Sequence, residues 1–420
     1  MKALVRFEHQ LLAVESEHQV NCMLELLAPA GPEGQARPPL HLALVIDRSG
    51  SMAGPKLEVT RECAAFLVRR LALTDELALI TYDGEVQLLA PLAPVDPDVL
   101  LPIIASIQPG GQTNLSGGWL KGVEELGRGL GEGPRKVLLL TDGLANVGIS
   151  DPAALTAMAR KTAESAGVGT TTIGFGEGFD EALLTAMADA GRGNAHHAPT
   201  PDAAPAIFAG EFEGLMSLVA QNVSVEIRPS EDVQLLGILN GFPQVAVAGG
   251  VQMQLGDAYG EERRRVIFQL HIAELATLGV AKVAEVVLRY VTVGEQVAMH
   301  ETRIPLTVNL VSADEAAAAE ADHEVTEEVV ILKAARAQTQ AREHADRGEF
   351  EIARKLLSEA AEELRTTAPG SVQAEELLAT AEMLGESFTL MSPADYDPSV
   401  RKLMHYESRK MSERRKKREP

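Results

Sequence analysis

The sequence predicts an α/β domain with a doubly wound, mostly parallel sheet, inserted in an antiparallel β-sandwich module and followed by a C-terminal helical region. Three observations support this fold class. Apolar runs alternate with helical stretches from about 41 to 220, period-two runs occupy 223–312, and from 313 onward the chain is rich in Ala, Glu, Leu and Lys. We place the parts as follows: a sandwich at 1–38 and 223–312, the α/β domain at 39–222, a helical hairpin or arm at 313–392, and a basic tail at 393–420.

The N-terminal segment is expected to belong to the sandwich. Val20, Cys22, Leu24 and Leu26 alternate with more polar neighbours, which is the pattern of a strand with one apolar face. An isolated hairpin would be barely stable. We therefore predict that residues 1–38 add strands to the sheets formed by 223–312.

Length and composition are typical of a globular protein with two or three domains, since 45% of the 420 residues are hydrophobic. The two cysteines, Cys22 and Cys63, give no disulfide framework and are expected to be reduced, packed thiols. The N-terminus lacks the apolar core of a signal peptide, and no apolar run approaches the roughly 20 residues of a membrane helix. We expect a cytoplasmic protein without a transmembrane segment.

The charge is unevenly distributed. The net charge is −22, although residues 401–420 carry nine Lys or Arg against three Glu. The rest of the chain is therefore strongly acidic. This argues against general nucleic-acid binding, because such binding needs a basic surface. The end of the chain, "RKMSERRKKREP", is expected to be mobile, with at most a weak contact to an anionic surface through 401–418. A solubilising end without a partner is the alternative.

Oxygen-bearing side chains follow three expected strand ends or loops. The strand "LALVID" ends in Asp47, and the D-x-S-x-S run that follows directs Ser49 and Ser51 to the same side of an extended loop. The Gly-rich loop "PGGQTNLSGG" carries Thr113, and "KVLLLTDG" ends in Asp142. Ligands of doubly wound sheets bind at the carboxyl ends of the strands. Because Mg²⁺ prefers hard oxygen ligands, we predict a site for Mg²⁺, with Mn²⁺ or Ca²⁺ as alternatives.

This constellation, in this order, resembles the metal-ion-dependent adhesion site of the von Willebrand factor type A domain. The stretches "PPLHLALVIDRSGSMAGPKLE", "IQPGGQTNL" and "TTIGFGEGFDEALL" are similar to the subfamily of inter-alpha-trypsin inhibitor heavy chains and chloride-channel-type bacterial proteins, over about 38–220. The resemblance implies that both serines bind the ion directly and that the threonine and aspartates bind it directly or through water. It also implies one coordination position left for a partner's carboxylate, and β structure flanking the domain.

The function that we expect is a magnesium-dependent scaffold or interaction protein that binds an Asp or Glu side chain of a protein partner. It would need no small-molecule cofactor and would not be an enzyme. The alternative is a metal-dependent, phosphatase-like hydrolase that uses the strand-end aspartates, although dehalogenase-type phosphatases need a second acid where Ser49 stands. An EF-hand loop starting at Asp47 would need glycine where Met52 stands. A purely structural turn, capped by Asp47 and Ser49, is the remaining interpretation.

Other motifs carry less weight. "GFGEG" at 174–178 is interpreted as a strand-end turn, because the lysine of a phosphate-binding loop is missing. His196 and His197 are neighbours that point to opposite faces of a strand, so we interpret them as surface histidines that do not share a metal. Residues 341–364 resemble a single tetratricopeptide-like helical hairpin, for which a packed helical appendage is the favoured interpretation.

Overall fold

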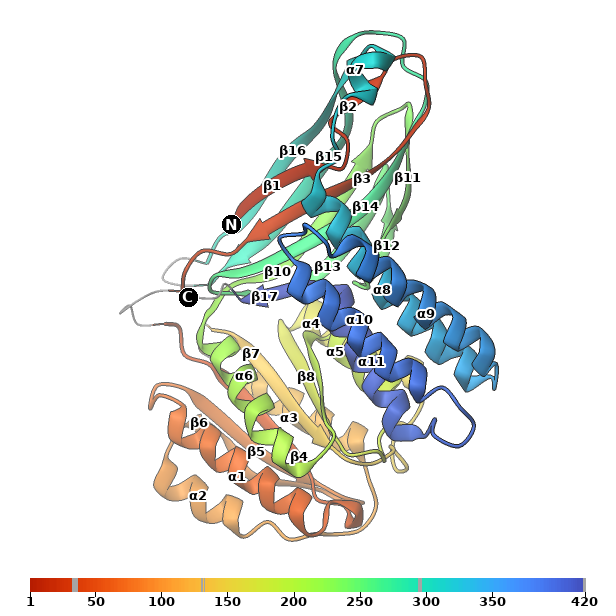
Figure 1. Ribbon diagram of the computed structural model, residues 1–420. Coiled ribbons are helices and arrows are strands. Elements are labelled where there is room, and N and C mark those ends of the chain that lie inside the picture. Colours follow the sequence, from red (N-terminus) through yellow and green to blue (C-terminus); the bar gives the residue numbers. More distant parts are fainter. Residues whose placement is uncertain (32–36, 130, 132, 294–296, 418–420) are drawn as a thin grey trace. The chain divides into compact units, whose positions relative to one another are not determined.

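A computed structural model describes residues 1–31, 37–129, 131, 133–293 and 297–417. The chain forms two compact units, which Figure 1 shows in ribbon form. The α/β unit comprises Gly31–Gln221 and Thr292–Ala298, and the sandwich unit comprises Met1–Ala30, Asn222–Val291 and Met299–Pro420. The predicted fold class, an α/β domain inserted in an antiparallel β module with a helical C-terminal region, is confirmed.

The α/β unit is built on a six-stranded sheet with the order β6-β5-β4-β7-β8-β9. All neighbours in it are parallel except β5 and β6. The strands are β4 (His41–Asp47), β5 (Glu76–Tyr82), β6 (Val86–Pro94), β7 (Arg135–Thr141), β8 (Val168–Phe175) and β9 (Arg192–Ala198). The helices are α1 (Pro55–Arg70), α2 (Pro97–Ala105), α3 (Leu115–Arg128), α4 (Pro152–Ser165), α5 (Glu181–Ala190) and α6 (Ala204–Met216), with short 3₁₀ turns η1 (Gly50–Met52) and η2 (Pro201–Ala203).

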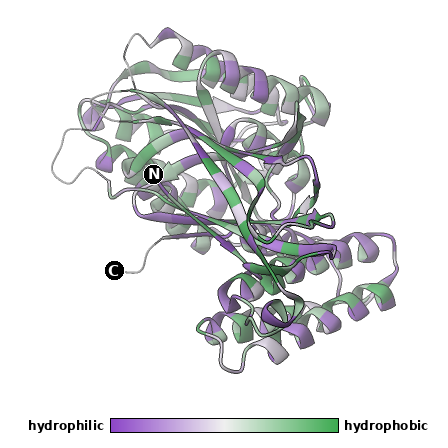
Figure 2. Cartoon of the chain, turned by 90° about the horizontal axis from the view of Figure 1, so that it is seen from above, coloured by the Kyte–Doolittle hydropathy of each residue, from purple (hydrophilic) through white to green (hydrophobic). Residues whose placement is uncertain are grey.

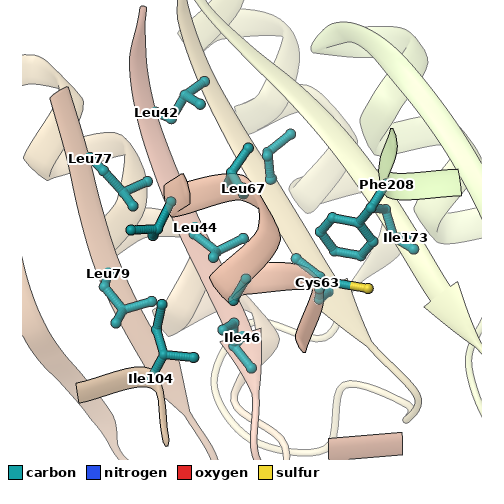
Figure 3. Close-up of a cluster of buried hydrophobic side chains, with 14 of the residues drawn as sticks. Leu42, Leu44, Ile46, Cys63, Leu67, Leu77, Leu79, Ile104, Ile173 and Phe208 are labelled. Carbon is teal, nitrogen blue, oxygen red and sulfur yellow. The ribbon is translucent and has the colours of Figure 1, made fainter. Parts of the chain in front are cut away.

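The central strand β4 is buried along its whole length, which explains its uninterrupted apolar run. On one face, Leu42, Leu44 and Ile46 pack with Leu67 of α1 and Phe208 of α6 in the main core cluster (Figure 3). On the other face lies α3. The core therefore fixes β4 from both sides, and with it the loop that follows Asp47.

Helix α3 approaches the sheet closely because two of its residues have no side chain. A Cβ atom on Gly122 would lie 2.8 Å from Cγ2 of Val45, and one on Gly118 would lie 2.4 Å from Cδ1 of Tyr82. The helix begins after Asn114, whose side chain accepts a hydrogen bond from the backbone N–H of Gly117. This close packing places the loop before α3 at the carboxyl edge of β4 and β5.

The sandwich unit contains two sheets. One has the order β1-β3-β14-β11, with β17 also paired to β14, and the other has the order β12-β13-β10-β15-β16-β2. The strands are β1 (Lys2–Phe7), β2 (Leu11–Ala13), β3 (His18–Leu27), β10 (Leu218–Pro229), β11 (Val233–Ile238), β12 (Gln244–Val247), β13 (Gly250–Tyr259), β14 (Glu262–Ile272), β15 (Gly279–Thr292), β16 (Met299–Val311) and β17 (Arg415–Lys417).

The N-terminal segment adds strands to these sheets, as its alternating pattern predicted. Strand β3 pairs with β14 from Arg263↔Leu27 to Ile272↔His18, and β2 pairs with β16. The two cysteines are buried and free, and burial raises the pKa of both thiols. Within the α/β unit, a Cβ atom on Gly31 would lie 3.9 Å from Cα of Ser217, so the two ends of that unit's main segment are neighbours.

The helical region comprises α7 (Ala313–Ala317), α8 (His323–Asp346), α9 (Phe350–Thr367), α10 (Ala374–Thr389) and α11 (Pro398–Glu413). Figure 2 shows that the helices carry both hydrophilic and hydrophobic residues, as expected for elements with one buried face. One face of α8 packs through Val325 and Leu332 on Met23 of β3 and Ile267 of β14, and a second cluster joins α8 to α9, α10 and α11. The helical region and the sandwich therefore form one compact unit.

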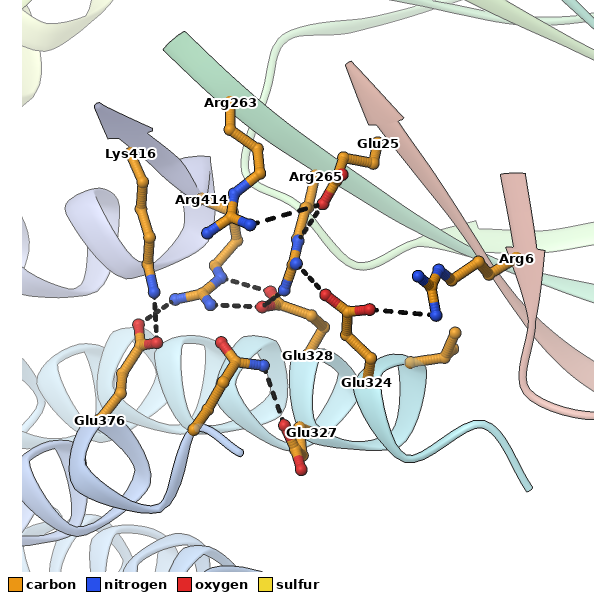
Figure 4. A network of polar contacts seen from close by, with 12 residues as sticks. Arg6, Glu25, Arg263, Arg265, Glu324, Glu327, Glu328, Glu376, Arg414 and Lys416 are labelled. Carbon is orange, nitrogen blue, oxygen red and sulfur yellow. Dashed lines mark hydrogen bonds and ion pairs between the residues drawn. The ribbon is translucent and has the colours of Figure 1, made fainter. Parts of the chain in front are cut away.

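The expectation of a mobile basic tail at 393–420 was wrong for the residues described. This segment forms α11 and β17, and β17 pairs with β14. The positive charges meet acidic partners from distant parts of the chain: Arg414 pairs with Glu328 and Glu376, and Lys416 also pairs with Glu376 (Figure 4). Residues 418–420 lie outside the described residues. The part of the chain that the structure describes contains no helix with the length and apolar composition that crossing a membrane requires.

Candidate metal centre

Asp47 stands at the carboxyl end of β4 and is completely buried. Its Oδ1 accepts a hydrogen bond from the backbone N–H of Ser49 at 2.8 Å, and its Oδ2 accepts one from Oγ1 of Thr141 at 2.7 Å. Burial raises the pKa of Asp47 to about 6, although these hydrogen bonds act in the opposite direction. The carboxylate is therefore held in one orientation, and a nearby cation would favour its charged form.

The first and third motifs are joined by hydroxyl groups. Oγ of Ser49 lies 3.1 Å from Oγ of Ser51, and Ser51 donates a hydrogen bond from Oγ to Oδ1 of Asp142 at 2.6 Å. Asp142 follows β7, the strand next to β4, and is almost completely buried. The structure thus brings together the side chains that the sequence placed 91 residues apart.

Thr113 completes the group from the second loop. A Cβ atom on Gly143 would lie 3.3 Å from Oγ1 of Thr113 and 3.6 Å from Oγ of Ser51, so both hydroxyls lie against the same glycine. The loop is tied to the third motif, since the backbone N–H of Thr113 donates to Oδ1 of Asn146 at 2.9 Å. The structure therefore brings the five predicted side chains together at the carboxyl edge of the sheet: Asp47, Ser49, Ser51, Thr113 and Asp142.

Asp83 supports this site from beneath the second loop and was missed in the sequence. Its Oδ2 accepts a hydrogen bond from the backbone N–H of Gly111 at 3.2 Å and lies 2.9 Å from Nη2 of Arg48. A Cβ atom on Gly110 would lie only 1.8 Å from the same oxygen, which explains a glycine there. A signal was present, because "ITYDG" ends a third strand in an aspartate.

Lys56 is the second residue that sequence reasoning missed. Its Nζ lies 2.5 Å from Oδ2 of Asp142, and the side chain is 32% exposed. A Cβ atom on Gly176 would lie 3.6 Å from Cε of Lys56, so the lysine runs along the "GFGEG" turn after β8. This turn also approaches the site directly, since a Cβ atom on Gly178 would lie 2.5 Å from the carbonyl oxygen of Asp142.

The two histidines are half-buried rather than on the surface, and each makes its own contact. Nε2 of His196 lies 3.0 Å from Oε2 of Glu211, whereas Nε2 of His197 lies 2.9 Å from the carbonyl oxygen of Gly176. Burial would raise the pKa of Glu211, but His196 and other polar neighbours lower it well below the usual range. These contacts indicate a structural role.

The donor atoms of the site fit a hard divalent cation. Three hydroxyls and two carboxylates could provide oxygen ligands, a donor set that suits Mg²⁺ or Mn²⁺ better than Zn²⁺, whose sites are richer in nitrogen and sulfur. Among the described residues, no group of three or more His, Cys, Asp or Glu could hold a metal ion by itself. A metal site at this edge would need further oxygen ligands, which the three hydroxyls can supply.

A doubly wound sheet with these hydroxyl- and carboxylate-bearing loops at its carboxyl edge defines the class of von Willebrand factor type A domains. Residues 41–209 match the family model described as the von Willebrand factor type A domain, so the chain contains a domain of this family.

Relatives match this part of the chain. The uncharacterized protein YfbK of Escherichia coli (strain K12) is 31% identical over 194 residues, which are 45% of this chain and 34% of that protein. Inter-alpha-trypsin inhibitor heavy chain H3 of Pongo abelii is 30% identical over 205 residues, 46% of this chain and 23% of that protein. The chain thus spans well under two thirds of both relatives.

The fold of the whole chain is similar to that of a solved von Willebrand factor type A protein from Catenulispora acidiphila. The TM-score is 0.71 at 14% identity, with 98% of this chain and 96% of that chain covered. At this level of identity, the similarity extends to the fold alone.

Proposed function

We propose that the α/β unit binds one divalent ion, Mg²⁺ with Mn²⁺ or Ca²⁺ as alternatives, and uses it to hold an Asp or Glu side chain of a protein partner. The ligands would be Asp47, Ser49, Ser51, Thr113 and Asp142. The observation that carries the proposal is the hydrogen bond from Ser51 to Asp142, because it joins the first and third motifs beside the hydroxyl of Thr113. A bound ion would supply a Lewis-acidic centre that attracts a carboxylate.

The chain's own residues prepare the site for this role. The N–H of Ser49 and the hydroxyl of Thr141 orient Asp47, and Asn146 and Asp83 hold the loop of Thr113. Ser51 is an exposed residue, so a partner could reach the site from solvent. Such rigid support of the ligands is what specific metal binding requires.

The alternative function, a metal-dependent hydrolase, has less support. A general base beside the ion would favour hydrolysis, because it takes the proton of the attacking water. The carboxylate of Asp83, which lies against the loop of Thr113, is paired with Arg48 and accepts the N–H of Gly111. We therefore propose an interaction or scaffold protein rather than an enzyme.

The proposal is tested by titrating the full chain with Mg²⁺ in a calorimeter. We expect binding to one site, and we expect Asp47→Asn to abolish it because the variant loses a charged ligand. Asp151→Asn is the matched control, since Asp151 caps α4 in the same unit and asparagine also caps helices. Unchanged affinity in Asp47→Asn, or no binding by the unmodified chain, would overturn the proposal.

A further inference from the structure

We propose that Lys56 sets the charge of the metal centre so that the loaded site accepts one carboxylate. This inference rests on the function proposed above and concerns a residue outside the ligand set. Nζ of Lys56 lies 2.5 Å from Oδ2 of Asp142, while Oδ1 of the same carboxylate accepts the hydroxyl of Ser51. Both oxygens of Asp142 are therefore engaged by groups of the chain itself.

The contact between Lys56 and Asp142 matters because it changes the net charge of the loaded site. Asp47 and Asp142 together carry two negative charges when ionised, so a divalent ion alone would make the centre neutral. Lys56 adds one positive charge at hydrogen-bond distance from Asp142, and the loaded centre then carries a net positive charge. Arg48, which precedes Ser49, does not contribute in the same way because its charge is balanced by Asp83. One carboxylate of a partner would restore neutrality.

The position of Lys56 is suited to this role. It lies in the first turn of α1, five residues after Ser51, and its side chain runs along the backbone of Gly176 to reach the buried carboxylate. Because Asp142 is withdrawn from solvent, the pair is only weakly screened by salt. The lysine thus opposes the binding of a cation and favours the binding of an anion to the cation once it is there.

Neutralising Lys56 should therefore change the affinity for the metal ion and the affinity for the carboxylate in opposite directions. Replacing Lys56 by a neutral residue removes a repulsion and strengthens metal binding. The same change lowers the positive charge of the loaded centre and weakens carboxylate binding. A lysine that only stabilised the loop would affect both in the same direction, because a distorted site binds the ion and the carboxylate less well.

Acetate serves as the carboxylate probe. If acetate binds the Mg²⁺-loaded site more tightly than the empty site, acetate must also tighten the binding of Mg²⁺. Thermodynamic linkage makes the two factors equal. The full chain is titrated with Mg²⁺ in sodium acetate and in sodium chloride of equal ionic strength, at about pH 8, above the range in which Asp47 titrates. For the unmodified chain we expect tighter Mg²⁺ binding in acetate.

For Lys56→Met we expect Mg²⁺ to bind at least about fivefold more tightly in chloride, and the gain from acetate to be largely lost. Lys56→Arg keeps the charge and is expected to retain the gain, so it preserves the test if the methionine variant does not fold. Lys121→Met is the control, since Lys121 pairs with the exposed Glu124 and the buried Glu125 of α3 and not with a proposed ligand. Weaker Mg²⁺ binding in Lys56→Met, or an undiminished acetate gain, would overturn the inference. Failure of the underlying function is distinguishable, because the unmodified chain would then bind no Mg²⁺.

Discussion

Arg414 donates two hydrogen bonds to Glu328, from Nε to Oε2 and from Nη2 to Oε1, each 2.5 Å long. Both side chains are buried, and Nη1 of Arg265 donates to the same carboxylate at 2.6 Å (Figure 4). Burial would raise the pKa of Glu328, but the two guanidinium charges lower it. The pair joins α8 to the residue that precedes β17, and therefore anchors the end of the described chain on the sandwich unit.

Glu328→Gln should destabilise the sandwich unit, because two buried arginines then lose their shared negative charge. We expect a loss of about 3 kcal/mol in the free energy of unfolding, measured by urea denaturation. Glu363→Gln is the matched control on α9, where the carboxylate forms an exposed pair with Lys333 and should contribute less than about 1 kcal/mol. If both variants lost the same free energy of unfolding, burial would not be what makes the pairing of Glu328 important.

Glu262 should make the sandwich unit sensitive to acid. Burial would raise the pKa of this carboxyl, but the charges of Arg415 and Arg264 lower it to about 2 from an unfolded value of 4.5. The unfolded chain therefore takes up the proton first, so this stabilisation is complete above about pH 4.5 and is lost as the pH falls towards 2. In urea unfolding across this range, Glu262→Gln should be less stable at neutral pH and should approach the unmodified chain as the pH falls. Parallel curves for the two proteins would refute this.

Two glycines of α3 should respond in opposite ways to alanine. Gly118→Ala places a Cβ atom against the buried ring of Tyr82 and should cost about 1–3 kcal/mol of stability in the α/β unit. Gly127→Ala meets no atom within 4 Å and should stabilise the helix by about 0.5–1 kcal/mol. Thermal unfolding of both variants measures the difference, and a stabilising Gly118→Ala would show that the helix does not need this close approach.

Asp83→Ala should loosen the loop of Thr113 although Asp83 is not among the proposed ligands. The variant loses the acceptor for the N–H groups of Gly111 and Glu85, at a cost of about 1–3 kcal/mol in local stability. Hydrogen exchange over 109–114 should become faster, whereas Asp151→Ala, at the start of α4, should leave this segment unchanged. Unaltered exchange in Asp83→Ala would mean that other contacts hold the loop.

Much of the fold and the grouping of the five side chains could be predicted because the signals are local. The buried run before Asp47 and the alternation around Cys22 each lie within one strand. The order of parallel strands then brings Asp47 and Asp142 to one edge.

Contacts between residues distant in sequence could not be predicted in this way. Lys56 looks like an ordinary residue of an amphipathic helix until Asp142, 86 residues later, lies beside it. The basic tail looks solvated for the same reason, since Glu262 is 153 residues away from Arg415. Charge patterns in one segment do not reveal whether buried counter-charges are supplied by another.

The proximity of Gly31 and Ser217 has a consequence for how such a chain can change over generations. An inserted domain whose two ends lie close together can be joined to two neighbouring residues of the other domain. It can therefore be gained, lost or replaced during evolution without longer linkers. The sandwich unit takes its strands from the segments before and after the α/β unit, so a lineage could keep the sandwich while exchanging the α/β unit.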